Sequence, residues 1–166
     1  FNNDRRRNIM TISMIETVED DIKTALNAET GFIQPNFTIF SAENDEDEDV
    51  DFEYDVPNII YGNESTPVDY FMDGTRMFSS EFIFQVNVSE FNSITVGGTA
   101  LTRKRLVNYA LDKIQKTLNE MTFSNVDVVE FNTTVGETSA KVPINEDEFL
   151  YRGALGMSIT YIDETG

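Results

Sequence analysis

Residues 81–90 read EFIFQVNVSE, and apolar and polar side chains alternate along most of this stretch. The even positions from Phe82 to Val88 are all apolar, whereas Gln85 and Asn87 stand at odd positions. A period of two places alternate side chains on opposite sides of a pleated strand. The stretch therefore predicts a long strand with one covered face and one face in contact with water.

A second stretch, near the end of the sequence, has the same period. Residues 149–162 read FLYRGALGMSITYI, in which Leu155, Met157, Ile159 and Tyr161 alternate with small or polar residues. Two such strands present an apolar face that another layer has to cover. We therefore expect helices on one side of the sheet.

Two segments have the pattern of amphipathic helices. Within residues 9–28, Ile15, Val18, Ile22 and Leu26 recur at spacings of three and four residues, which places them on one helical face. Residues 101–121 repeat this pattern. The apolar stripe of this second predicted helix comprises Val107, Ala110, Leu111, Ile114, Leu118 and Met121.

The remaining segments complete the predicted fold. β-rich segments predict short strands at residues 37–40, 56–61 and 126–131, and polar or Gly-containing segments predict connections at residues 62–80 and 92–99. Residues 133–147 are expected to form either a polar loop or a weak hairpin around Gly136. The expected fold class is α+β, with a mainly antiparallel sheet of about four to six strands flanked by two amphipathic helices in a single domain. That domain covers residues 9–166, follows a basic arm at residues 1–8 and carries an acidic insertion at residues 43–55.

Composition excludes several classes of chemistry. The sequence has no Cys and no His, so disulfides, thiolate metal sites and His-dependent triads are impossible. Its formal net charge of −18 opposes binding to nucleic acid or to an anionic membrane. No stretch is apolar enough to span a membrane, and the N-terminal residues do not resemble a signal peptide.

The acidic insertion is the most unusual stretch. The acidic residues expected to set the local electric field are Asp45, Glu46, Asp47, Glu48, Asp49 and Asp51. Like-charge blocks of this kind usually form solvated loops. A calcium site is an alternative because Ca²⁺ binds carboxylate oxygens, but the spacing lacks the Gly turn and the closing Glu of an EF-hand. In a ring of several copies, these loops would set the electric field at the mouth or channel.

A basic triplet, Arg103, Lys104 and Arg105, stands at the start of the second predicted helix. Cations are unfavourable there because the helix N-terminus carries partial positive charge. Two interpretations remain open: the side chains point into water, or they contact acidic groups on a neighbouring subunit. The residues 5–7, all Arg, raise the same possibility.

Other candidate contact residues are Arg152, Tyr70, Phe71 and Phe78. A cross-strand pair with an acid such as Glu130 is the simplest role for Arg152. The three aromatic residues either hold the predicted connection at residues 62–80 in place or contact another subunit.

No catalytic motif is present. The glycines fit neither a phosphate-binding loop nor a dinucleotide fingerprint, and no carboxylate pair is singled out as a glycosidase site. We expect no enzymatic activity and no cofactor or metal.

The order of these segments resembles the tail terminator and tail-completion (neck) proteins of long-tailed bacteriophages. The similarity covers most of residues 10–162 and is carried by MIETVEDDIKTAL (14–26), PNIIYG (57–62), FIFQVNVSEF (82–91), TRKRLVNYALDKIQKTL (102–118) and YRGALGMSITYI (151–162). The acidic insertion and the connection at residues 62–80 depart from the shortest members.

The resemblance implies a virion protein, made in the host cytoplasm, that forms a homo-oligomeric ring, usually a hexamer. Such a ring caps the tail-tube protein, stops its polymerisation and meets the head–tail connector proteins. DNA passes through the ring without specific binding, and an acidic lumen would repel its phosphates. No membrane partner is implied.

Two rival functions fit parts of the sequence. An acidic monomer could imitate DNA phosphates and inhibit a host nucleic-acid-binding protein. That function predicts acids in rows over a surface, whereas here the densest acids share one segment. The second rival is a carboxylate enzyme or a calcium-binding module.

Overall fold

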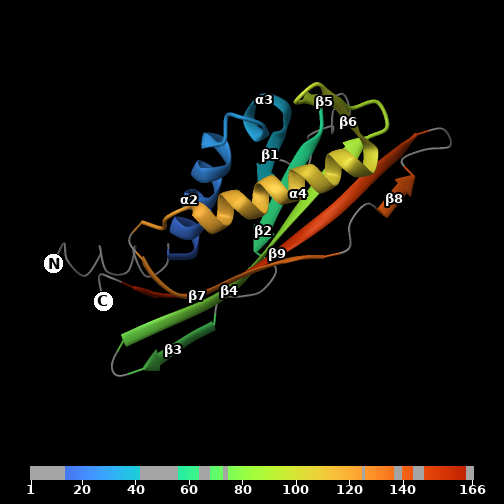
Figure 1. The fold of residues 1–166 in the computed structure, drawn as a ribbon. Coiled ribbons are helices and arrows are strands. Elements are labelled where there is room, and N and C mark those ends of the chain that lie inside the picture. Colours follow the sequence, from blue (N-terminus) through green and yellow to red (C-terminus); the bar gives the residue numbers. More distant parts are fainter. Residues whose placement is uncertain are drawn as a thin grey trace.

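The computed structural model describes residues 14–41, 56–63, 68–72, 75–124, 126–136, 140–143 and 148–163. Over these residues the chain forms one main sheet, a two-stranded sheet and three helices (Figure 1). The helices are α2 (Met14–Ala28), α3 (Ile33–Asn36) and α4 (Arg103–Glu120). The strands are β1 (Thr38–Ser41), β2 (Asn58–Asn63), β3 (Val68–Met72), β4 (Thr75–Ser89), β5 (Ser93–Val96), β6 (Thr99–Thr102), β7 (Val126–Val135), β8 (Ala140–Pro143) and β9 (Phe149–Asp163).

The main sheet has the strand order β1-β2-β4-β9-β7, with β3 also paired to β4 and β8 also paired to β9. Strands β1 and β2 pair in parallel, and every other pair of strands described in this sheet is antiparallel. The prediction of an α+β fold with a mainly antiparallel sheet is confirmed.

Two strands of 15 residues, β4 and β9, form the centre of the sheet. They pair from Met77 opposite Ile162 to Ser89 opposite Leu150. Each long strand has two partners along its other edge: β2 and β3 follow one another along β4, and β7 and β8 do so along β9. At about 3.4 Å per residue the central strands span about 50 Å. They extend beyond the helical layer at both ends (Figure 1).

The apolar faces of these two strands lie under the helices, as the alternation predicts. From Phe82 to Val88, every even-numbered side chain of β4 is buried, and β9 buries Leu155, Met157, Ile159 and Tyr161 in the same core. The core also contains the predicted stripes of both helices, with Val18, Ile22 and Leu26 from α2 and Val107, Ala110, Leu111, Ile114 and Leu118 from α4.

Helix α4 approaches the sheet closely at Gly153. A Cβ placed on this glycine would lie 2.6 Å from Cγ1 of Val107 and 2.8 Å from Cδ1 of Leu111. Both side chains are buried in α4, so the space beside Gly153 is already filled. The missing side chain at this position therefore sets how closely the helical layer packs on β9.

Two predicted connections are wrong in part because they contain strands. Residues 68–72 and 75–80, expected in a loop, form β3 and the first part of β4. Residues 92–99, expected as a turn, contain most of the β5–β6 hairpin, which turns at Gly97 and Gly98 with positive φ angles. Residues 133–135 extend β7, and β8 continues beside β9.

Candidate assembly surfaces

The basic triplet occupies the first turn of α4. The side chains of Arg103, Lys104 and Arg105 are all exposed, and none has an ion pair with another residue in the described part of the chain. The N-cap residue, Thr102, makes no side-chain capping bond, and the first turn contains no acidic residue. Three cations beside uncapped N–H groups repel the positive end of the helix dipole.

Arg103 also has an unfavourable backbone conformation. Its φ angle is +52°, which lies in the left-handed region that residues with a Cβ avoid. Strain of this kind costs about 1–3 kcal/mol. The start of α4 thus combines uncompensated charge with backbone strain at one exposed point.

The charge of α4 is opposite to that of the rest of the molecule. Its five basic and two acidic residues give α4 a formal charge of +3, so the other residues of the chain together carry −21. The five basic residues are Arg103, Lys104, Arg105, Lys113 and Lys116. The net acidic charge of the chain is therefore carried outside this helix.

Exposed acids gather at the other end of α4. Glu120 ends the helix, Asp127 follows in β7, and Glu16 and Asp20 are exposed on α2. Asp21 holds α2 beside this end, because its carboxylate accepts hydrogen bonds from the backbone N–H and Oγ of Ser124, each at 2.8 Å.

These exposed acids, Glu16, Asp20, Glu120 and Asp127, are called the acidic flank below. An 18-residue helix is about 27 Å long, so the basic triplet and the acidic flank lie on opposite sides of the subunit (Figure 1).

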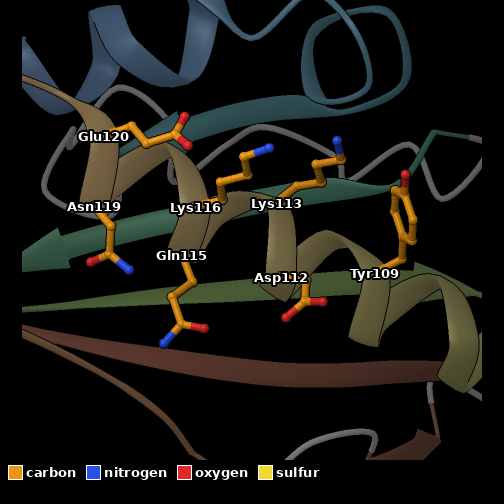
Figure 2. Close-up of a pocket in the computed structure, with 7 residues that line it drawn as sticks. All are labelled: Tyr109, Asp112, Lys113, Gln115, Lys116, Asn119 and Glu120. Atoms are coloured by element: carbon orange, nitrogen blue, oxygen red, sulfur yellow. The ribbon is translucent and has the colours of Figure 1, made fainter.

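An open groove of about 470 Å³ lies along the outer side of α4. Figure 2 shows Tyr109, Lys113 and Lys116 pointing to one side of the helix, and Asp112, Gln115 and Asn119 pointing to the other. Nζ of Lys113 lies 5.6 Å from the centre of the Tyr109 ring, within cation–π range. The groove is lined by acidic, basic and neutral polar side chains together with Tyr109.

Arg152 lies on the sheet face away from the helices, within a chain of hydrogen bonds. Its Nε donates to Oδ1 of Asn87 at 2.8 Å, and Nδ2 of Asn87 donates to Oδ1 of Asn58 at 2.9 Å. The predicted pairing of Arg152 with Glu130 is wrong, because Glu130 lies opposite Thr160 in the sheet. The cross-strand partner is Asn87, and it is neutral.

The candidate aromatic residues separate into two groups. Phe78 is 6% exposed and stacks on Tyr161 with ring centres 5.4 Å apart. It is a core residue, so its burial fits the first of its two predicted roles, holding its own segment in place. Tyr70 and Phe71 lie in β3 opposite Met77 and Arg76, and their side chains lie outside the described part.

Two predicted features fall outside the described residues: the basic arm at residues 1–8 and the acidic insertion at 43–55, including Asp45, Glu46, Asp47, Glu48, Asp49 and Asp51. Among the residues that are described, no group of three or more Asp, Glu, His or Cys side chains could hold a metal ion. No described helix is long and apolar enough to cross a membrane.

A buried polar cluster lies between α2 and the sheet. The hydroxyl groups of Ser80 and Tyr161 are buried without a hydrogen-bond partner in the described part of the chain. Burial raises the pKa of Tyr161, and the negative charge of Glu19 acts in the same direction. Ser80 has the opposite influence on this pKa, although its hydroxyl does not reach hydrogen-bond geometry with the phenol.

No protein-family model matches the chain, and no curated protein matches its sequence. Sequence patterns had identified the basic triplet but not the acidic flank, whose members come from three separate elements. The excess of basic residues within 103–120 was the signal that could have indicated a charged contact surface.

Proposed function

We propose that this chain is the subunit of a homo-oligomeric ring, and that the ring is a tail terminator or tail-completion ring of a long-tailed bacteriophage. It would cap the tail tube and join it to the head. The fold supports the proposal at the level of architecture, because the resemblance in sequence implies a small α+β subunit and the structure has that fold.

The observation that carries the proposal is the separation between the basic triplet at the start of α4 and the acidic flank beside its end. A cyclic ring needs a heterologous contact, in which two different patches of one subunit meet the opposite patches of its neighbours. The basic triplet and the acidic flank supply two such patches on opposite sides of the subunit. Carboxylates from a neighbour would neutralise the three cations and stabilise the uncapped helix end.

The net charge supports the proposed passage of DNA. Six copies would carry a formal charge of about −108 in total, and a negative lumen repels phosphate groups. Contacts between subunits would use the basic groups of α4, so a strongly acidic chain could still assemble with itself.

Reciprocal charge reversal tests the contact. One variant carries Arg103→Glu, Lys104→Glu and Arg105→Glu, and the other carries Asp20→Lys, Glu120→Lys and Asp127→Lys. All six side chains are exposed, so we expect both variants to fold. In light scattering, each variant alone should lose the oligomer, and an equimolar mixture should regain it.

If both variants assemble like the unaltered chain, the charged patches do not form the contact. If all forms stay monomeric, including in the presence of tail-tube ends, the acidic inhibitor becomes the better explanation.

A further inference from the structure

Strand β7 forms one end of the main sheet, and no strand lies on its outer side in the described part of the chain. Three of the exposed large apolar side chains belong to this strand, with Val128 39%, Val129 52% and Val135 39% exposed. An open edge with apolar side chains is a template for pairing with another segment.

The register shows which backbone groups point outward. The N–H of Gly136 donates to the carbonyl oxygen of Ala154 at 2.9 Å, and Val135 lies opposite Leu155. Hydrogen-bonded and non-hydrogen-bonded pairs alternate in an antiparallel ladder. The backbone N–H and C=O groups of Phe131, Thr133 and Val135 therefore point away from β9.

The two halves of β7 differ in how they resist pairing. The first half carries the exposed acids Asp127 and Glu130, and its register shifts between Val128 and Glu130. Charges and bulges are common protections of an edge strand. The second half, residues 131–135 with the sequence FNTTV, has no charge, no Pro and a regular register.

An open groove of about 420 Å³ lies beside β7. It lies between the C-terminal end of α4 and β7, and its apolar lining comprises Leu118, Met121, Phe123, Val126, Val128 and Phe131. An open strand beside an apolar groove is the arrangement that binds an extended peptide by strand addition. Main-chain hydrogen bonds provide affinity, and the groove accepts a side chain.

The charge around this site favours a basic segment. Asp127 lines the groove, Glu130 is exposed in β7 directly before Phe131, and residues 121–136 contain no basic residue. The chain has two basic triplets, and the one at residues 103–105 is helical. The other lies in residues 1–13, FNNDRRRNIMTIS, which carry a formal side-chain charge of +2 and several apolar side chains.

We propose that residues 1–13 of a second copy add to the open half of β7 as an extended segment, with an apolar side chain in the groove and the arginines near the acids. Thirteen extended residues reach about 43 Å, further than the roughly 27 Å length of α4. The inference depends on the proposed ring, and it identifies a contact that links one subunit to the next.

The first test blocks the edge without breaking the sheet. Thr133→Pro removes an outward N–H, which an edge strand tolerates. Thr133→Val is the matched control, because both variants lose the 3.1 Å hydrogen bond from Nε2 of Gln115 to Oγ1 of Thr133, but only the proline removes the N–H. In light scattering, Thr133→Pro should lose the oligomer and Thr133→Val should keep it. If the two variants assemble equally well, the inference is wrong, although the ring itself stands.

The second test separates a contact between copies from one within a chain. Because the chain has no Cys, the double variant Asn8→Cys/Val135→Cys contains the only two thiols. After mild oxidation, disulfide-linked multimers on a non-reducing gel would support exchange between copies. Monomers with an internal disulfide would overturn the inference, because residues 1–13 would then lie beside β7 of the same chain. Absence of any cross-link would overturn the inference as well.

Discussion

Nε of Arg152 donates a hydrogen bond to Oδ1 of Asn87 across the two central strands, at 2.8 Å. Asn87 in turn donates to Asn58 at 2.9 Å, so one amide connects three adjacent strands. Asn87 is only 4% exposed, and a buried polar group is costly once its partner is removed.

Asn87→Ala should therefore lower the free energy of unfolding by about 1–3 kcal/mol, measured by urea denaturation. It removes both hydrogen bonds and leaves the buried amide of Asn58 without its partner. Gln85→Ala, on the same sheet face, is the control, because Gln85 is half-buried and makes no such bond with another described residue. Equal losses in the two variants would show that the network contributes no stability of its own.

Gly153→Ala should destabilise the fold by about 1–3 kcal/mol, the usual cost of overpacking. The added methyl group would meet Val107 and Leu111 at less than 3 Å. Gly156→Ala in the same strand should have a much smaller effect, because its nearest neighbour beyond the adjacent residues is a backbone oxygen at 3.8 Å. Thermal melting of both variants measures the difference, and a larger loss for Gly156→Ala would contradict the packing described for α4.

Ionisation of Tyr161 should lower the free energy of unfolding at alkaline pH. Burial raises the pKa of its phenol in the folded protein above the unfolded value, which is about 10. The folded state therefore binds the phenolic proton more tightly than the unfolded state does. The resulting contribution to the free energy of unfolding is complete below pH 10 and decreases as pH rises through 10 and above.

Tyr161→Phe should reduce this alkaline loss and should cost little at neutral pH, because the buried hydroxyl has no partner among the described residues. Urea denaturation of both proteins from pH 8 to 11 compares them. Parallel curves for the two proteins would contradict the assignment to Tyr161.

Arg103→Gly should raise the free energy of unfolding by about 1 kcal/mol, because glycine adopts the positive φ of this position without strain. The control, Arg105→Gly, lies in the same turn without positive φ and should lower stability by up to about 1 kcal/mol. Stabilisation of both variants would indicate relief of charge repulsion instead of backbone strain.

The sequence predicted the centre of the fold well because the even positions from Phe82 to Val88 and the odd positions from Leu155 to Tyr161 are all apolar and buried. It did not predict the start of β4, where Ser79 and Ser80 interrupt the apolar pattern even though Ser80 is buried. At that end, pairing with β3 and β9 determines the strand.

The contact surfaces were less predictable. The basic triplet is contiguous in sequence and was recognisable, whereas the partner of Arg152 depends on the register between strands 65 residues apart. A two-residue period defines the faces of a strand but does not determine which strand lies beside it. The groove beside β7 likewise forms only when α4 and β7 pack together.

Electron microscopy of tail tubes tests the proposed function most directly. The tubes would be polymerised from the tube subunit encoded in the same genome, with and without this chain. We expect a ring of this protein at one end of each tube and no further growth at that end, whereas the Arg103→Glu/Lys104→Glu/Arg105→Glu variant should leave the ends uncapped. Tubes that grow equally long with the unaltered chain present, and that carry no ring, would contradict the proposed function.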